Sequence, residues 1–147
     1  MPRIALWNLF FGFALICFAA ASGAILANDL SNAFMDAHET GRILTRDWTL
    51  TLQSSAHGHT NLFGLIHIAL GLTMPHARQS HRMRLGITGG LTLGALAMGP
   101  FMIWRSFLAP ARHLEFNGIV IGIFLCFALA ALAAHTAGLW QAFARRE

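Results

Sequence analysis

Long apolar stretches separated by short polar ones dominate this chain. Four of them stand out, at roughly residues 4–27, 57–74, 85–104 and 117–140. Each has close to the ~20 residues with which an α-helix crosses ~30 Å of hydrocarbon, and within a bilayer only helices or closed barrels satisfy their own backbone groups. The pattern predicts an all-α integral membrane protein, a bundle of four transmembrane helices that forms one domain over residues 1–147.

The first apolar stretch is longer than the ~7–15 residues of a secretory signal core, so we expect it to be a membrane helix. The only long connection follows it, over residues 28–56. Within that connection the sequence SNAFMDAHE, at 31–39, predicts a separate short surface helix that ends at Gly41.

Charged residues are scarce, and the basic ones are all arginine. The chain has 10 basic and 6 acidic residues and no lysine, and a few arginines flanking apolar segments do not make a nucleic-acid surface. Most arginines fall near the N-terminus, in the loop 75–84 and near the C-terminus, so the positive-inside rule places these parts in the cytoplasm. We expect a bacterial inner membrane, with its two interfaces marked by Trp7, Trp48, Trp104 and Trp140.

The second apolar stretch opens with AHGHTNLFG at 56–64, which is unusually polar for a membrane helix. At 100° per residue, one stripe of this helix collects small and polar residues: His57, Thr60, Gly64, His67 and Gly71. The other side collects His59, Phe63, Ile66 and Leu70. We expect the first stripe to face the bundle interior or a subunit boundary, and the second to face lipid.

Polar side chains are predicted to gather at two depths. The outer group consists of His57, His59, Asn61, His113, Glu115 and Asn117, and the inner group of His67 with His135. Ionisable residues inside a membrane are costly and by default mark functional sites. We therefore interpret both groups as candidate ligand sites.

Several ligands suit such imidazoles. Haem b needs one or two axial histidines, an apolar slot and small residues beside the ring, for which Gly64 is a candidate. A zinc ion, or a copper ion with Met98 and Met102, is an alternative on His57, His59 and His113. A third alternative is a scaffold with no cofactor, whose histidines only bond neighbouring helices.

The stretch AHGHTNLFG at 56–64, with ARHLEFNG at 111–118, resembles the helix entry of the styrene oxide isomerase family. Members of that family are small four-helix membrane proteins that hold haem b between the subunits of a trimer. The resemblance implies that His57 ligates ferric haem and that the iron acts as a Lewis acid on the oxygen of a small hydrophobic epoxide, which opens towards an aldehyde.

The same resemblance suggests which residues line the distal space. The position of the family's asparagine holds Phe63 here, with Asn61 nearby, and the chain contains no tyrosine to match the family's tyrosine on the third helix, where Phe101 and Trp104 stand. Asn61, Phe63 and Trp104 are therefore the predicted substrate-facing residues.

A second resemblance covers one helix. The sequence HTNLFG, at 59–64, is similar to the low-spin-haem helix of the large subunits of nitric oxide reductase and cbb3-type oxidase. It implies His59 as the axial ligand, and a b-type cytochrome or a small accessory subunit of an electron-transfer complex, working with a quinone. Paired axial histidines would be His59 with His113, or His67 with His135.

Overall fold

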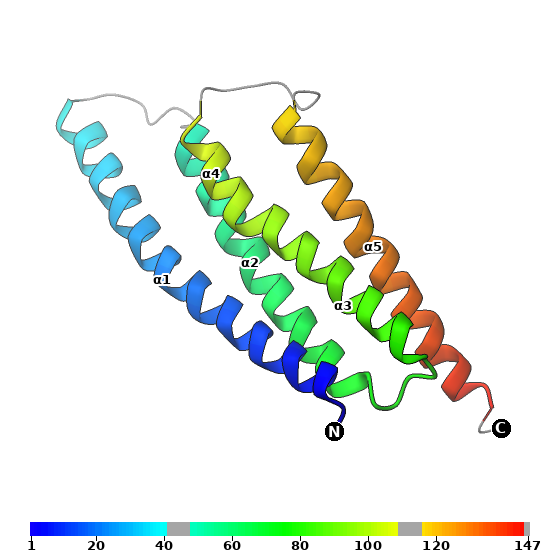
Figure 1. Ribbon diagram of the computed structural model, residues 1–147. Helices are drawn as coiled ribbons and strands as arrows, with labels where there is room; N and C mark the ends of the chain where they lie inside the picture. The colour runs from blue at the N-terminus through cyan, green and yellow to red at the C-terminus, as the bar shows by residue number, and fades with distance from the viewer. Residues whose placement is uncertain (41–47, 109–115, 146–147) are drawn as a thin grey trace.

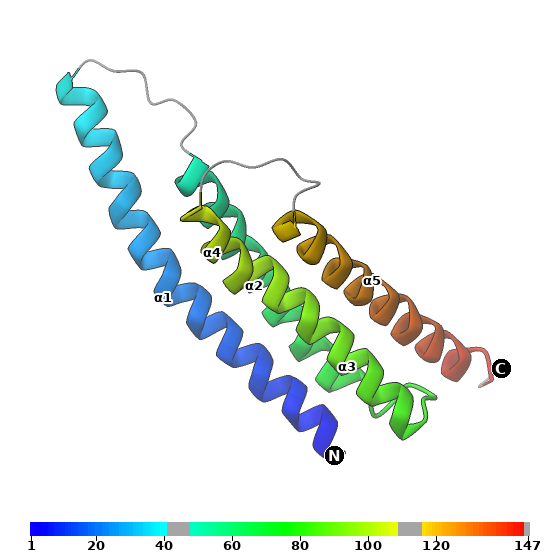
Figure 2. The same ribbon diagram turned by 45° about the horizontal axis from the view of Figure 1, so that its top comes forward.

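The computed structural model describes residues 1–40, 48–108 and 116–145. This part of the chain contains helices joined by turns and no strand, as the sequence predicts. The elements in chain order are α1 (Arg3–Thr40), α2 (Trp48–Thr73), α3 (His81–Leu96), the π-helix η1 (Ala97–Phe101), α4 (Met102–Ser106) and α5 (Phe116–Phe143). Because α3, η1 and α4 follow one another directly, they form one rod, and Figures 1 and 2 show four rods lying side by side.

Three of these rods are long and apolar enough to cross a membrane: α1, the α3–η1–α4 rod over His81–Ser106, and α5. The sequence prediction of apolar spans is confirmed for these three. Helix α2 has sufficient length, at 26 residues, but the polar run at 54–61 in its N-terminal half lowers its hydropathy. It packs against both α1 and the α3–η1–α4 rod, so much of this polar surface faces protein.

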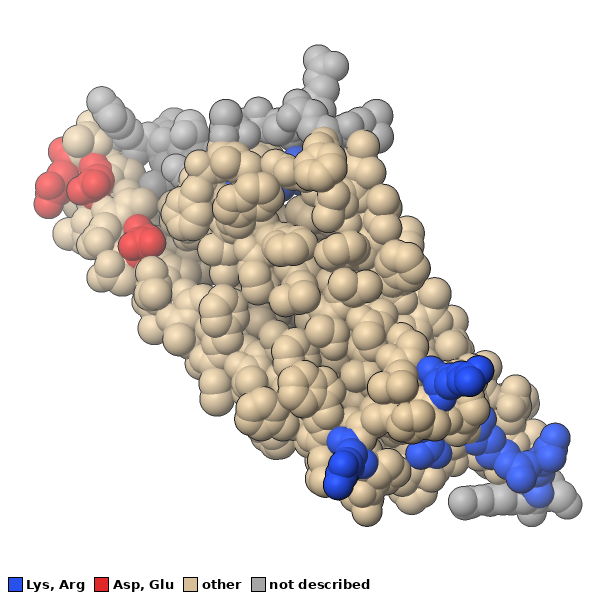
Figure 3. Space-filling view, viewed as in Figure 1, with Lys and Arg blue, Asp and Glu red and all other residues tan. Residues whose placement is uncertain are grey.

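The charged residues lie at the two ends of the bundle. One end, which includes the N-terminus, holds five of the six described arginines, Arg3, Arg78, Arg82, Arg84 and Arg145, and the far end of α1 holds Asp29, Asp36 and Glu39 (Figure 3). The sixth, Arg105, is buried on α4 towards this second end, over the ring of Trp48. We call the first the arginine end and the second the acidic end. The described stretches between them, at 4–28, 48–77, 85–104 and 116–144, contain no charged residue. A charge-free band between two charged ends is what a bilayer-spanning bundle requires.

Helix α1 is much longer than expected. Its 38 residues span about 57 Å at 1.5 Å per residue. The prediction of a separate surface helix over 31–39 is wrong, because α1 runs through these residues without a break and ends at Thr40. The sequence offers neither glycine nor proline between Gly23 and Gly41 to interrupt it. Gly41 itself lies outside the described residues.

Close helix packing depends on glycines. A Cβ atom on Gly12 would lie 2.6 Å from the carbonyl oxygen of Gly64, and one on Gly71 would lie 2.8 Å from the carbonyl oxygen of Ala5. These contacts bring the backbones of α1 and α2 together. Gly90 makes the same kind of approach between α3 and α5, where its Cβ would lie 2.9 Å from the Phe127 carbonyl oxygen.

The helix stripe predicted for α2 is partly confirmed. Thr60, Gly64, His67 and Gly71 are all buried, as expected. The prediction that the other side faces lipid is wrong for Phe63 and Leu70, which are 5% and 3% exposed and belong to the core. The α3–η1–α4 rod covers this side of α2, and the ring of Phe63 fills the space beside Gly94. Periodicity shows which residues share a face but not which helix covers it.

Candidate functional site

The imidazole of His57 is held between α2 and α1. Its Nδ1 atom lies 2.9 Å from the carbonyl oxygen of Ala19. A carbonyl can only accept, so Nδ1 carries the proton and donates it, and in the neutral ring Nε2 keeps a lone pair. The side chain is half-buried. This arrangement, one nitrogen donating to a backbone carbonyl and the other left basic, is the usual one for a metal-ligating histidine.

Gly23 makes room for this ring. A Cβ atom at that position would meet Cε1 of His57 directly and would lie 2.8 Å from Nδ1. The glycine therefore forms a cradle on α1 that only a residue without a side chain can provide. Sequence analysis does not single out Gly23. The available signal is a lone glycine within an alanine-rich stretch of the first apolar segment.

Of the three residues predicted to line the distal space, the structure brings one to His57. The amide Nδ2 of Asn61 lies 3.4 Å from His57 Nε2, where it donates a weak hydrogen bond to the lone pair. Phe63 instead packs in the core beside Gly94. Trp104 is 54% exposed on α4, so it projects outward from its own bundle.

Gly64, the small residue predicted to lie beside a haem ring, serves helix packing. A Cβ atom there would lie 2.8 Å from the side chain of Ile16 and 3.0 Å from the Gly12 carbonyl oxygen. No space for a macrocycle exists at this point. Gly58, the next residue along the chain from His57, is exposed, and beyond its own turn of helix no atom lies within 4 Å of a Cβ placed there.

His59 faces a different direction from His57. Two residues turn an α-helix by about 200°, so these two imidazoles lie on nearly opposite sides of α2. The Nδ1 atom of His59 donates to the carbonyl oxygen of Ser55 at 2.8 Å, which leaves its Nε2 basic as well. The two rings cannot ligate the same ion from these positions.

The predicted zinc or copper set is therefore not assembled by the described residues. Among them, no three histidine, cysteine, aspartate or glutamate side chains lie close enough to hold a metal ion. His113 and Glu115 lie outside the described residues, and Asn117 is half-buried on the first turn of α5. Met102 is buried in the bundle.

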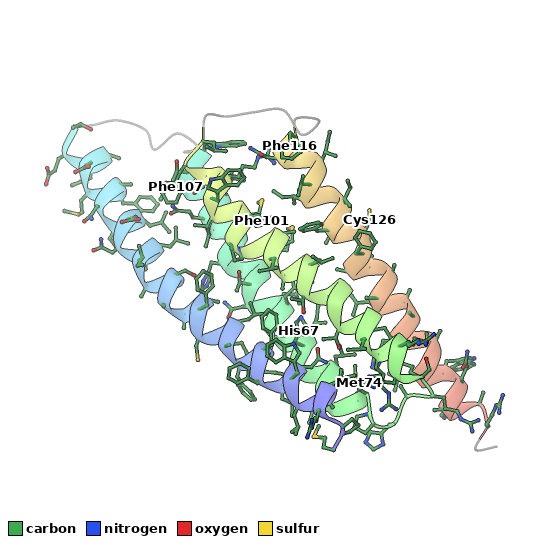
Figure 4. The ribbon with its side chains drawn as sticks, viewed as in Figure 1. His67, Met74, Phe101, Phe107, Phe116 and Cys126 are labelled. Carbon is green, nitrogen blue, oxygen red and sulfur yellow. The ribbon has the colours of Figure 1, made fainter. Side chains whose placement is uncertain are left out.

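His67, labelled in Figure 4, is completely buried. It belongs to a polar network that joins α1, α2 and α3. Asn8 donates from Nδ2 to the carbonyl oxygen of Ile4 at 2.9 Å and to Thr88 Oγ1 at 2.8 Å. Its Oδ1 atom therefore accepts from His67 Nδ1, also at 2.8 Å. The ring of Phe11 packs edge-on against the imidazole, with 4.9 Å between centroids. Asn8 was missed by sequence analysis, although an amide in an otherwise apolar segment is a usable signal.

His135 uses both of its nitrogens. Thr73 donates its hydroxyl proton to the Ala69 carbonyl, so its oxygen accepts from His135 Nε2 at 2.8 Å. Gln79 Nε2 lies 3.2 Å from His135 Nδ1 and donates to it. His67 and His135 thus belong to two separate networks, and the described contacts do not join them as the paired ligands of one site.

The α3–η1–α4 rod, which packs against α2, departs from regular α-helix near the acidic end. Pro100 lies inside the π-helix η1, where its missing N–H accounts for the break in regular hydrogen bonding. In this π-helical turn Gly99 lies against Thr60, whose hydroxyl oxygen would be 2.6 Å from a Cβ atom on that glycine. This contact fixes α2 against the rod one turn from His57.

No protein-family model, curated protein or solved structure matches the chain. Function is therefore inferred from the site itself. An iron porphyrin suits the donor set at His57: one fixed imidazole with a basic Nε2, an open neighbour at Gly58, and exposed small side chains at Ala20 and Ala24 on α1. Close chelation of a small ion suits it less, since among the described residues no three histidine, cysteine, aspartate or glutamate side chains lie close enough to hold one.

Proposed function

We propose that this chain is a multi-pass membrane protein that binds one haem b per subunit through Nε2 of His57 and isomerises a small hydrophobic epoxide. The hydrogen bond from His57 Nδ1 to the Ala19 carbonyl is the observation on which the proposal rests. It fixes both the tautomer and the orientation of the ring, which are the two properties that an axial ligand needs.

In this proposal all four rods cross a bacterial inner membrane, α2 included, with both termini in the cytoplasm. The separation of the arginine end from the acidic end supports that orientation through the positive-inside rule. The ring of His57 is only half-buried within the single bundle, and in this proposal another copy of the chain supplies the remaining wall of the haem site. A homo-oligomer, a trimer by resemblance, follows.

When bound, ferric haem supplies a Lewis-acidic iron that polarises an epoxide oxygen. The chain's own contribution is positional. His57 would hold the group through Nε2, Gly23 and Ala19 keep its ring in place, and the amide of Asn61 offers a hydrogen-bond donor at the edge of the site. Helix α2, which holds His57 and Asn61, contains no charged residue, which favours a neutral substrate that enters from the lipid.

In the proposed homo-oligomer, Trp104 keeps its predicted role as a substrate-facing residue. Because it projects outward from α4, it would reach a ligand at His57 only across a subunit boundary. Phe63 has no such route, since it is enclosed in the core of its own bundle, and we do not include it in the proposed site.

The proposal is tested by haem content and spectrum. The full chain is expressed with ample haem supply, extracted in mild detergent and compared with His57→Ala and with His59→Ala as a matched control. We expect a high-spin ferric Soret band in the parent protein that shifts on addition of an azole, near-complete loss of haem in His57→Ala and full retention in His59→Ala. Unchanged haem content in His57→Ala contradicts the proposal. Conversion of an aryl epoxide to its aldehyde by the haem-loaded protein tests the activity separately.

An electron-transfer function is the second candidate. It is favoured by one observation, the basic Nε2 of His59 that results from the bond to the Ser55 carbonyl. A low-spin, readily reduced haem that disappears in His59→Ala would support a b-type carrier or accessory subunit working with a quinone. Absence of any Soret band in all preparations would leave the cofactor-free scaffold.

A further inference from the structure

The arginine end of the bundle contains a groove between α1 and α3 that the proposed haem site does not use. Its volume is about 790 Å³, within the range of about 300–1,000 Å³ that small-molecule sites occupy. Arg3 lies at its mouth, and Trp7, Leu85 and Leu93 supply apolar walls. Asn8 and Ala19, which mark the two regions on α1, are eleven residues or about 16 Å apart along the helix, so the groove and His57 are separate.

Glycine gives the groove its depth. Gly89 lines it, and a Cβ atom at this position would have no neighbour within 4 Å. This distinguishes Gly89 from Gly90, which contacts the backbone of α5. The open space beside Gly89 is therefore not needed for packing within the described bundle, and it is wide enough for an added chain of methylene groups to lie against the helix.

The floor of the groove presents a hydrogen-bond donor. Thr88 accepts the Asn8 amide at its Oγ1 atom, and its own hydroxyl proton has no acceptor among the described residues. Thr60, Thr73 and Thr92 each donate this proton to the backbone carbonyl four residues earlier. A hydroxyl proton left over in an apolar groove favours a ligand with an oxygen acceptor at this depth.

The charged residues around the groove indicate which kind of ligand it binds. Arg3 is exposed at the mouth of the groove, and the same end holds Arg78, Arg82, Arg84 and Arg145. The described acids, Asp29, Asp36 and Glu39, all lie at the opposite end (Figure 3). An anionic headgroup would therefore meet cations without competition from a described carboxylate, as basic sites for anionic lipids on the cytoplasmic side do.

We propose that this groove binds one anionic phospholipid. Its phosphate pairs with Arg3, an ester carbonyl accepts the hydroxyl proton of Thr88, and one acyl chain lies over Gly89 towards Leu93. The site is built by α1 and α3 of a single chain, so it needs neither haem nor a second copy. Its occupancy would fix the spacing of these two helices at the arginine end.

Native mass spectrometry of the detergent-solubilised full chain, titrated with phosphatidylglycerol or phosphatidylcholine, tests this proposal. We expect the first phosphatidylglycerol to bind about fivefold more tightly than the first phosphatidylcholine, the effect of one arginine near an anionic surface. The substitution R3Q should remove this preference, and G89L should lower the occupancy of both lipids. Two matched variants should change neither: R145Q, an exposed arginine at the same end, and G122L, a glycine with open space on α5.

A second measurement locates the lipid. In vesicles that contain brominated phosphatidylglycerol, quenching of tryptophan fluorescence should exceed that by brominated phosphatidylcholine, and W7F should abolish the difference while W140F preserves it. Trp7 lines the groove, whereas Trp140 is an exposed tryptophan near the same end of α5. Equal binding of the two lipids, or variants R3Q and G89L that behave like R145Q and G122L, would overturn the proposal.

Discussion

Helix α2 presents two histidines, ten residues apart, in opposite circumstances. His67 is completely buried, with its Nδ1 bonded to Asn8 and the ring of Phe11 packed against it. His57 is half-buried, with its Nδ1 bonded to a backbone carbonyl, and its Nε2 lies beside Gly23 and 3.4 Å from the weak donor Asn61. The first histidine connects three helices, whereas the second keeps a basic nitrogen at the contact between α1 and α2.

The difference shows how the same residue type divides between structure and chemistry. In the network of Asn8, His67 and Thr88, amide, hydroxyl and imidazole groups bond to one another, although Nε2 of His67 is buried without a hydrogen-bond partner among the described residues. Such bonding is favoured because a polar group in a membrane core is expensive to leave without any partner. Near the acidic end, the backbone of α1 satisfies one imidazole nitrogen and leaves the other accessible. Four substitutions distinguish these two roles.

The largest effect is expected from Gly64→Leu, at the contact between α1 and α2 that both histidines share. The added side chain meets Ile16 and the Gly12 backbone, and such overpacking should lower the free energy of unfolding by about 3 kcal/mol. Denaturation in mixed micelles measures it. Gly58→Leu is the control, because that position has open space. Equal loss in the two variants would mean that the close approach of α1 and α2 is not essential.

Gly23→Ala tests the cradle of His57. The new methyl group would occupy the place of the imidazole ring, and displacement of a ligand by a change in its supporting residues typically weakens metal binding about 10–100-fold. Haem titration of the apoprotein measures the effect, with Gly58→Ala as the matched control. If Gly23→Ala binds haem as tightly as the parent, His57 is not the ligand in this orientation.

His67→Ala should give the opposite result to His57→Ala. Loss of the buried imidazole leaves Asn8 Oδ1 without its hydrogen-bond donor, and we expect the free energy of unfolding to fall by about 1–2 kcal/mol. Haem content should stay at the parent level. The same denaturation assay on haem-free His57→Ala should show a change of no more than about 0.5 kcal/mol. Haem loss in His67→Ala at unchanged stability would reverse the assignment of the two histidines.

The smallest effect is expected from Thr88→Val, which preserves shape and removes the acceptor of the Asn8 amide. Hydrogen bonds between membrane helices contribute about 0.6 kcal/mol on average, and the variant should lose roughly that amount. Thr88→Ser retains the hydroxyl and should behave like the parent. Thr92→Val, which loses only a bond to its own helix, gives the background for this comparison.

The sequence predicted the helices well and their partners poorly. Apolar length was enough to identify α1, the α3–η1–α4 rod and α5. It failed for residues 31–39, because a polar continuation of a helix has the same composition as a separate surface helix. It also failed for Phe63, because the helical period places this ring on a face without showing that Gly94 leaves room for it.

The sequence by itself determined that this protein is helical and apolar over at least three spans, because these properties follow from composition and from the length of uncharged segments. Only the tertiary structure decided which polar atoms meet. The bond from His67 to Asn8 joins residues 59 positions apart, and that from His57 to Ala19 joins residues 38 apart. Both depend on the relative shift of α1 along α2, which is fixed by the close contact of Gly12 with Gly64 and not by the periodicity of either helix.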